Sequence, residues 1–378
     1  MSRTSSSAAE NQVLAVIGSG RARSRREISA ILGLSASTVS QHVQSLITQG
    51  LIAEGEARGS TGGRRARELQ LAGETDRLGV IDLGGGHARL AVLPRGGALG
   101  ETAEISVDLR DGAEAVLERC IDELRSLASG QTLAGIGIAL PGPVDPETHG
   151  VVSPSRMPGW AGRDIAALIE RLSSAPAVVE NDANAMALGE HFARTSHAAA
   201  SVTVKAGTAI GSGIVIDGSV YRGAGGVAGD ITHTRVAAAH QHPCSCGNLG
   251  CLETVSSGAA LVRLLQNEGV EVATTQEVLS LVRDGHPRAT ALTRSAGHHL
   301  GEVLCAVVNF FNPSAIYLGG SLSSLEPFVS ALRSEIYEGS HPLMTRDLTI
   351  APAALGADAS LVGVSRQINE HLARLTRG

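Results

Sequence analysis

Three of the five cysteines fall within eight residues, and this grouping is typical of a metal site. Cys244, Cys246 and Cys251 are close together, and His233 lies eleven positions before the first of them. Thiolates grouped with one imidazole suit a tetrahedral Zn²⁺ ion with three sulfur ligands and one nitrogen ligand. That set leaves no position for a metal-bound water. We therefore expect a structural zinc ion that positions its neighbours rather than one that activates water.

A disulfide and a chance grouping account less well for these cysteines. A disulfide would leave an odd cysteine, and the N-terminus does not resemble a signal peptide. A chance grouping is disfavoured because buried structural cysteines rarely cluster with glycines and prolines. His240 and His242 are less favoured as ligands, and we expect both to be solvated. Cys120 and Cys305 lie in apolar helical patterns and are expected in the core.

Composition and charge point to a globular protein with a basic N-terminal part. The chain has 378 residues, of which 43% are hydrophobic and 18% charged, enough for two or three domains. No apolar run approaches the roughly 18–20 residues that span a bilayer, so we expect a cytoplasmic protein without a membrane partner. Residues 1–72 carry a formal charge of +4, and the remainder carries −10. Only the first part is therefore expected to meet a polyanion.

Residues 1–72 have the pattern of a winged helix-turn-helix domain. Residues 11–17 predict a first helix, and Ser24 and Glu27 fit a capping box that opens a second, with Ile28, Ile31 and Leu32 on one face. A third helix follows Gly33–Ser35 and buries Val39, Val43, Leu46 and Ile47. A glycine-rich hairpin wing comes next. The residues expected to contact DNA are Ser37, Thr38, Ser40, Gln41 and Gln44 on the third helix and Arg64 and Arg65 on the wing. The alternative is a module that mediates only protein contacts.

Residues 73–378 predict an α/β domain of two matching lobes. Leu78–Leu93 and Val202–Ile216 each read as a strand, a glycine-rich turn and a second strand. Such turns can bring backbone N–H groups against phosphate oxygens. Buried strands are predicted at 135–140, 177–180 and 315–318, and helices at 113–128, 164–172, 257–267, 275–284 and 287–310. Two such halves imply a cleft that closes around a small ligand.

Five motifs occur in order along the chain: D-L-G-G-G-H at 82–87, G-I-G-I-A-L-P-G-P-V-D at 135–145, E-N-D-A-N-A at 180–185, G-T-A-I-G-S-G at 207–213 and C-S-C-G-N-L-G-C-L-E at 244–253. They resemble the motifs of the ROK family, which groups sugar-responsive repressors with sugar kinases of the actin-like ATPase fold. The cysteine string together with E-N-D-A-N in this order is specific. The segments S-A-S-T-V-S and T-G-G-R-R near the N-terminus resemble those of the family's regulators.

The resemblance implies a role for each matching residue. Asp182 would be the general base of a kinase, here weak or vestigial, and would bind sugar together with Asn181, Asp230, His233 and Glu253. His233 would also ligate zinc with the three cysteines. Asp182 alone could equally be a helix N-cap. ATP and Mg²⁺ would bind only if kinase activity is retained. The corresponding nucleotide-binding residues, expected to be degraded, are Gly84, Gly85, Gly86, Gly207, Thr208, Gly211, Gly319 and Gly320.

Several departures from the kinases concern phosphate binding. Gly86 and His87 stand where the kinases usually have threonine and lysine, so the first turn lacks a hydroxyl and a fixed cation. Asp230 replaces a glutamate, and Thr232, Ala209 and Ser212 replace glycines. The last two are expected to crowd ATP. We therefore expect a sugar pocket that acts as a sensor, with phosphotransfer lost or feeble.

The predicted function is a sugar-responsive transcription factor, most simply a repressor, whose effector is a sugar or a sugar phosphate. A homodimer or tetramer would read a near-palindromic double-stranded operator. The alternative is an active ATP-dependent sugar kinase of the glucokinase type with an accessory DNA-binding module. A third possibility is a zinc-braced scaffold that binds no small molecule.

Overall fold

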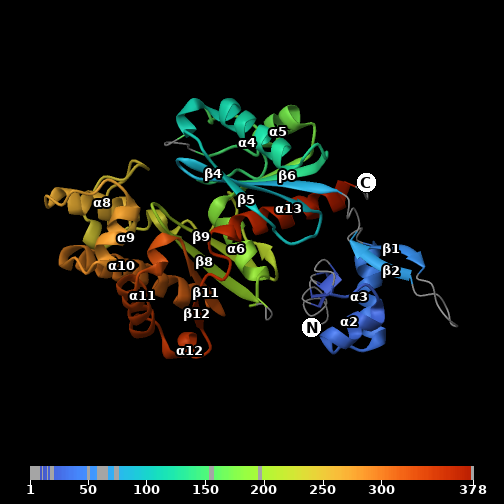
Figure 1. The fold of residues 1–378 in the computed structure, drawn as a ribbon. Helices are drawn as coiled ribbons and strands as arrows, with labels where there is room; N and C mark the ends of the chain where they lie inside the picture. The colour runs from blue at the N-terminus through green and yellow to red at the C-terminus, as the bar shows by residue number, and fades with distance from the viewer. Residues whose placement is uncertain are drawn as a thin grey trace. The chain divides into compact units, whose positions relative to one another are not determined.

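The computed structural model describes residues 9–10, 12–14, 16–17, 21–48, 52–57, 67–71, 76–152, 157–194 and 198–375. The chain divides into two compact units, one made of Met1–Asp182 with Leu361–Gly378 and the other of Ala183–Ser360. Figure 1 traces the chain through both units, and each is described by itself below. Within the described ranges, no helix is both long and apolar enough to cross a membrane.

The N-terminal part of the chain folds as a winged helix-turn-helix. The described positions of residues 9–17 are helical, and the following elements are α2 (Arg25–Leu32), α3 (Ala36–Thr48) and the antiparallel strands β1 (Ile52–Ala57) and β2 (Arg67–Leu71). The Ser24 hydroxyl caps α2 by accepting from the Glu27 N–H, and Gly33 ends that helix at φ 66°. Val13, Ile28, Val39, Val43 and Leu69 are fully buried in one core.

Two details of this part correct the sequence predictions. Ile31, expected on the buried face of α2, is 39% exposed, whereas His42 of α3 is only 7% exposed. The Glu27 carboxylate accepts from the backbone N–H of Arg23, one residue before the expected N-cap position. Helical periodicity predicts the direction in which a side chain points. The width of the buried face, which here includes His42 and leaves out Ile31, depends on how the neighbouring helix packs.

The first unit also contains a five-stranded mixed sheet in the order β5-β4-β3-β6-β7. Strands β3, β4 and β5 pair antiparallel, whereas β3, β6 and β7 pair parallel. Its strands are β3 (Arg77–Leu83), β4 (His87–Pro94), β5 (Thr102–Ser106), β6 (Leu133–Leu140) and β7 (Ala177–Asn181). The hairpin of β3 and β4 has Gly84–Gly86 at its turn, as the sequence predicted.

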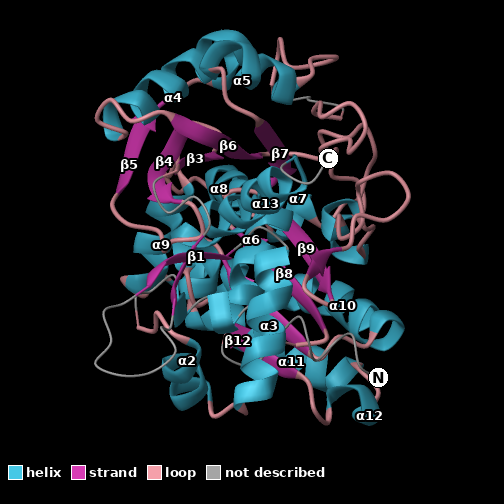
Figure 2. Ribbon diagram, turned by 90° about the vertical axis from the view of Figure 1, so that its right-hand side faces the viewer, coloured by secondary structure: helices cyan, strands magenta, loops and turns pink. Residues whose placement is uncertain are grey.

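Successive side chains of β6 point to opposite faces of this sheet, and helices pack against both faces. Ile136 and Ile138 lie in the core that includes α4 (Ala113–Leu127) and α5 (Ile165–Ser173). On the other face, Gly135 and Gly137 let α13 (Ala359–Leu375) approach closely: a methyl group on Gly137 would lie 2.7 Å from the Val364 carbonyl oxygen. Figure 2 shows α4 and α5 above the strands and α13 below them.

The second unit repeats the plan around a sheet in the order β10-β9-β8-β11-β12. Strands β8 and β9 form an antiparallel hairpin, and β8, β11 and β12 run parallel. The strands are β8 (Ala200–Ala206), β9 (Ile210–Ile216), β10 (Ser219–Val220), β11 (Ala315–Gly319) and β12 (Thr349–Pro352). Position for position, this order matches that of the first sheet, which confirms the predicted repetition.

Helices again lie on both faces. Helix α6 (Asp182–Phe192) packs against Gly211 and Gly213 of β9, while Val202, Val204 and Ile316 face a core shared with the remaining helices. Those helices are α7 (Glu253–Ser256), α8 (Gly258–Asn267), α9 (Thr275–Arg283), α10 (Pro287–Phe311), α11 (Glu326–Gly339) and α12 (Pro342–Thr345). The sequence predictions missed β5, β10, β12, α11, α12 and α13.

Candidate functional site

The predicted metal ligands come together in the second unit. His233 ends a short 3₁₀ helix (Ile231–His233), and its Nδ1 atom lies 3.5 Å from the Cys244 sulfur. The sulfurs of Cys246 and Cys251 are 3.7 Å apart. One donor atom from each of the four residues lies within 4.8 Å of all the others. Cys244 and Cys251 are buried, whereas His233 and Cys246 are exposed.

The backbone around the cysteines explains how residues so close in sequence converge. The Cys244 N–H donates to the Asn248 carbonyl, and Pro243 and Leu249 form an antiparallel bridge that closes the loop. Gly247 and Gly250 have φ values of 89° and 83°, which only glycine adopts readily. The Gly247 N–H donates to the Cys244 carbonyl at 3.0 Å, so the chain turns between these two residues and brings Cys246 beside Cys244.

These distances fit a tetrahedral ion. Zinc–sulfur bonds of about 2.3 Å place two sulfurs about 3.8 Å apart at tetrahedral angles, and a sulfur and an imidazole nitrogen about 3.6 Å apart. The observed separations are 3.7 Å and 3.5 Å. All five cysteines of the chain are free, so the disulfide alternative is excluded in this structure. The four residues therefore form a candidate metal site, and Cys120 and Cys305 are buried as predicted.

The pKa values of the Cys251 and Cys246 thiols are shifted in opposite directions. Burial, followed by hydrogen bonding to Cys246, raises the pKa of Cys251 to about 12. A hydrogen bond from the Asn248 backbone lowers the pKa of Cys246. A cation between these thiols would offset the desolvation of Cys251, because metal binding deprotonates a coordinating thiol. His240 is exposed as expected, whereas His242 is half-buried and so less solvated than predicted.

Two carboxylates flank the metal cluster along the chain. Glu253 begins α7 and is 6% exposed, and its Oε2 atom accepts the Ile210 N–H at 3.1 Å. Asp230 precedes the 3₁₀ helix that carries His233, and it is exposed. Glu253 is therefore a buried, hydrogen-bonded carboxylate, and Asp230 is an exposed one. Both lie next to the metal cluster along the chain.

Thr232 and Ser212, two residues that depart from the kinase pattern, hold the segment before the metal cluster in place. The Thr232 hydroxyl donates to the Ile210 carbonyl at 2.5 Å, and the Ser212 hydroxyl donates to the Gly229 carbonyl. Ser212 is 5% exposed and lies within β9 rather than on the turn. The expectation that Ser212 crowds a bound nucleotide is therefore wrong. Both hydroxyls fasten segment 229–233 to the start of β9.

The E-N-D segment lies in the first unit, where β7 ends and α6 begins. The Asn181 side-chain nitrogen donates to the Gly142 carbonyl at 2.8 Å and to the Asp182 carboxylate at 3.2 Å. Glu180, which is 3% exposed, accepts from the Asn181 N–H and from the Gln367 amide. Through these hydrogen bonds, the Glu180 carboxylate holds the end of β7 against α13.

Sequence reasoning missed Glu180 and Gln367 as supporting residues. Gln367 belongs to α13, which was not predicted although Val364, Ile368 and Leu372 recur at four-residue intervals. That periodicity predicts a helix, but it does not indicate that the helix returns to a sheet strand whose Glu180 lies 187 residues before Gln367 in the sequence.

The two glycine turns differ in how open they are. A side chain at Gly85 or Gly86 would meet nothing within 4 Å, whereas one at Gly84 would press on the His87 ring. Gly85 and Gly86 also border a cavity of about 580 Å³ whose other lining side chains include Arg110 and Arg119. The turn itself lacks a cation, but these two arginines, which sequence reasoning did not single out, bring cations beside it.

The second turn is engaged by α8. Gly258 and Ala259 at the start of that helix donate their N–H groups to the carbonyls of Gly207 and Thr208. Ala209 is exposed on the turn, as expected for a residue that could contact a nucleotide. Gly211 lies inside β9 and Gly319 ends β11. Gly320 follows the strand, has φ 81° and approaches the backbone of Ala206.

Five of the residues predicted to contact DNA lie on α3. On α3, Ser37, Ser40, Gln41 and Gln44 are exposed and Thr38 is half-buried. The Ser35 hydroxyl accepts the Thr38 N–H at 3.2 Å and so caps α3. Arg64 and Arg65 lie outside the described residues, between β1 and β2.

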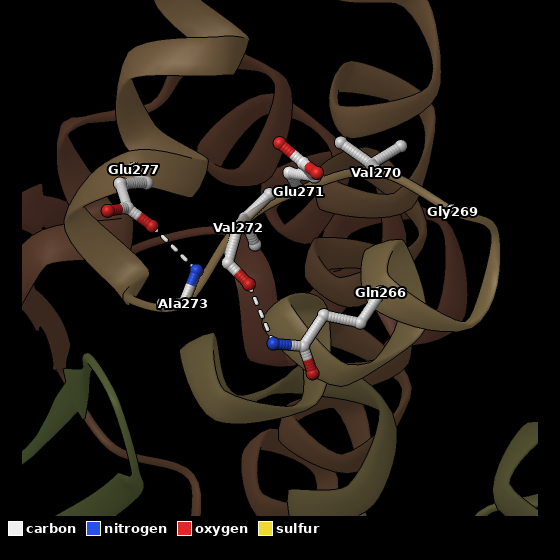
Figure 3. Close-up of a pocket in the computed structure, with 7 residues that line it drawn as sticks. All are labelled: Gln266, Gly269, Val270, Glu271, Val272, Ala273 and Glu277. Atoms are coloured by element: carbon white, nitrogen blue, oxygen red, sulfur yellow. Dashed lines mark hydrogen bonds between the residues drawn. The ribbon is translucent and has the colours of Figure 1, made fainter.

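A second cavity, of about 540 Å³, is bordered by the loop between α8 and α9 (Figure 3). Its polar groups largely serve the loop itself: Gln266 donates to the Val272 carbonyl at 2.6 Å, and Glu277 accepts the Ala273 N–H at 2.6 Å. The same Glu277 completes the capping box of α9. We assign no ligand to this cavity.

Comparisons with known proteins agree with this arrangement. The sequence matches the ROK family over residues 78–370 and the MarR family over residues 7–66. The xylose repressor of Bacillus spizizenii is 29% identical over 354 residues, covering 92% of this chain and 91% of the repressor. A solved ROK family transcriptional regulator, described as a homolog of the E. coli MLC protein, has a TM-score of 0.76 and 25% identity and covers 98% of both chains.

A solved sugar kinase matches a smaller share of this chain. The ROK family glucokinase of Streptomyces griseus, solved with glucose and AMPPNP, has a TM-score of 0.67 and 26% identity, covering 78% of this chain and 99% of the kinase. A winged helix-turn-helix joined to a sugar-kinase-like α/β domain defines the class of protein. The chain belongs to the ROK family.

Proposed function

We propose that this protein is a sugar-responsive transcriptional regulator that represses its target genes until a sugar or sugar phosphate binds. One observation carries the proposal: an exposed polar face on α3 occurs in the same chain as the metal cluster and carboxylates of a sugar-kinase-like body. The xylose repressor matches over 92% of this chain, whereas the glucokinase structure covers 78% of it. We assign DNA binding to residues 1–72 and effector binding to residues 73–378.

The sugar would be held by side chains whose hydrogen-bonding chemistry complements a ring of hydroxyls. Each hydroxyl both donates and accepts, a carboxylate accepts, and a carboxamide does both. Asn181 and Asp182 supply one amide and one carboxylate, and Asp230 and Glu253 supply two further carboxylates. Glu253 accepts the Ile210 N–H, so its carboxylate is held in a defined direction.

Zinc would be held by His233, Cys244, Cys246 and Cys251, and its role is structural in this proposal. The Nδ1 atom of His233 faces the thiols. Its other nitrogen, Nε2, then carries the proton and can donate to a sugar hydroxyl, since a ligating imidazole keeps its second N–H for a hydrogen bond. One histidine can in this way serve both the metal and the sugar.

Kinase activity is the second candidate function, because Asp182 stands at the position of the kinase general base. Transfer of a phosphoryl group depends almost entirely on positioning and on charge stabilisation around the phosphates. The first glycine turn has no hydroxyl or lysine of its own, and the Arg110 guanidinium is paired with Asp108 at 2.6 Å. We therefore expect phosphotransfer to be lost or feeble, with sugar binding retained.

A signal passes from sugar to DNA only if the sugar binds two states of the protein with different affinities. In a homodimer or tetramer, a change in the effector-binding part would alter the spacing of two DNA-reading modules. Two-fold symmetry calls for an operator with two half-sites separated by whole turns of the duplex. The exposed residues of α3 and the wing arginines Arg64 and Arg65 would provide the DNA contacts.

The test measures DNA binding by fluorescence anisotropy on the DNA upstream of the protein's own gene, with a panel of pentoses, hexoses, amino sugars and their phosphates. We expect one sugar to release the DNA. Glu253→Gln should abolish release and leave DNA binding intact, whereas Gly100→Ala, at an open position of the first unit, should behave as the wild type. Indifference of DNA binding to every sugar, together with robust ADP production from sugar, ATP and Mg²⁺, would establish the kinase instead.

A further inference from the structure

A second group of metal-ligating side chains lies between α10 and α11, away in sequence from every residue assigned above. His298 and Glu302 are one turn apart on α10, and Glu335 is on α11. The His298 Nδ1 atom is 2.7 Å from Glu335 Oε2, and its Nε2 atom is 3.7 Å from Glu302 Oε1. One donor atom from each of the three residues lies within 4.8 Å of the other two.

Glycines fix the distance between the two helices that carry these residues. A side chain on Gly297 would overlap the Phe328 carbonyl, and one on Gly301 would lie 2.6 Å from the Cβ atom of Glu335. The Cys305 thiol also donates to the Glu335 carbonyl at 3.1 Å. The backbones of α10 and α11 are therefore in direct contact on both sides of the ligand group, which holds its members on rigid elements.

The charges in this group suit a bound divalent metal ion better than salt bridges among the side chains alone. One imidazole can carry a single positive charge, whereas Glu302 and Glu335 together carry two negative charges. His299 lies beside them, with Nδ1 3.7 Å from Glu302 Oε2, and within the described part of the chain this nitrogen is buried without a hydrogen-bond partner. A divalent ion would neutralise both carboxylates and accept an imidazole lone pair.

We propose that His298, Glu302 and Glu335 bind a divalent transition-metal ion, with zinc as the best-suited ion. Imidazole and carboxylate ligands together are typical of zinc and similar borderline ions. The side chains of His298 and Glu302 are 49% and 44% exposed, so an ion reaches them from solvent and keeps water in its remaining positions. The ion clamps α10 to α11.

The geometry requires a small rearrangement. Ligand bonds of about 2.1 Å place neighbouring donor atoms about 3.4 Å apart around a tetrahedral ion. A single ion accepts the lone pair of only one imidazole nitrogen, whereas here Nδ1 of His298 faces Glu335 and Nε2 faces Glu302. With Nδ1 as the ligand, its contact of 2.7 Å with Glu335 has to open by about 0.7 Å, and the Glu302 carboxylate has to move from the Nε2 side of the ring toward Nδ1. His298 and Glu302 are exposed, so rotation of their side chains supplies this movement without any shift of the helices.

The experiment counts zinc bound to the full-length protein by equilibrium dialysis and elemental analysis at a fixed concentration of free zinc. We expect the wild type to hold one equivalent more than His298→Gln and than Glu335→Gln. Glu326→Gln, an exposed carboxylate at the start of α11, is the matched control and should bind as the wild type does. Zinc affinity of the second site should fall at least about tenfold in each ligand variant.

Two further measurements separate this site from the cysteine cluster. Cobalt at the cysteines gives intense thiolate charge-transfer absorption, and cobalt at His298 does not, so the two sites can be filled and followed independently. Once the cysteine cluster is filled with zinc, further zinc should raise the Tm of the wild type but not of His298→Gln. Equal zinc stoichiometry in the wild type and His298→Gln, each folded by circular dichroism, would overturn the proposal.

Discussion

The close contact between β9 and α6 makes Gly213 a sensitive position in the second unit. A methyl group added there would lie 2.6 Å from the Ala183 carbonyl oxygen, 2.7 Å from the Ala187 Cβ atom and 2.9 Å from the Asn184 Cα atom. Ordinary van der Waals contact begins at 3.4 Å, so the first turn of α6 would have to retreat by about 0.8 Å. These neighbours are backbone and Cβ atoms, which cannot rotate away.

The cost of Gly213→Ala follows from two opposing terms. Overpacking of this kind costs about 1–3 kcal/mol, and removing a glycine from a strand returns about 0.5–1 kcal/mol. We expect a net loss of about 1–2 kcal/mol in the free energy of unfolding, measured by urea denaturation. Gly100→Ala, where nothing lies within 4 Å, is the control and should leave stability unchanged.

The same substitution should weaken the response to sugar. Helix α6 begins at Asp182, so a retreat of its first turn moves a proposed sugar-binding carboxylate. Binding constellations need their groups within about 0.5 Å of the productive geometry. We expect about tenfold more sugar to be needed for DNA release. If Gly213→Ala matched Gly100→Ala in both stability and sugar response, the close packing would not position Asp182 and the reasoning would be refuted.

Three further predictions concern other parts of the molecule. Gln41→Ala should weaken DNA binding, measured by anisotropy, without changing the Tm, because this side chain is exposed on α3. Glu190→Gln should destabilise the fold by about 3–5 kcal/mol in urea, because the carboxylate is fully buried and accepts two backbone N–H groups. Hydrogen bonds from Arg110 lower the pKa of Asp108 to about 2, so an NMR titration should find its midpoint there. Arg110→Ala should move that midpoint up toward 3.8.

The sequence predicted those parts of the fold in which glycine and apolar alternation mark the local structure. The turns at Gly84–Gly86 and Gly207–Ala209 separate strands with buried, repeating apolar residues, so both hairpins were predictable from the chain itself. The metal cluster was predictable for a similar reason. Its three cysteines lie within one short loop, and loop closure alone brings them together.

Residues that act through a distant element were not predictable in this way. Glu180 is a buried carboxylate, and one of the groups that donate to it, the Gln367 amide, comes from the distant helix α13. The glycine turn at Gly85 does not predict that Arg119 of α4 lines the same cavity. Sequence spacing indicates which residues share an element, but the pairing of elements decides which residues share a site.

The departures from the kinase pattern have opposite consequences for the two ligands. At the first glycine turn, Gly86 and His87 remove a hydroxyl and an ammonium that would face phosphate, and nothing within the turn replaces them. Near the metal cluster, Thr232 and Ser212 add hydroxyls that bind the carbonyls of Ile210 and Gly229. These bonds fasten the segment that carries Asp230 and His233, so one pair of substitutions removes groups from the proposed phosphate side and the other pair braces the proposed sugar side. A protein that must recognise a sugar without consuming it needs this combination, since a rigid sugar site gives a defined signal and an intact phosphate site would destroy the ligand.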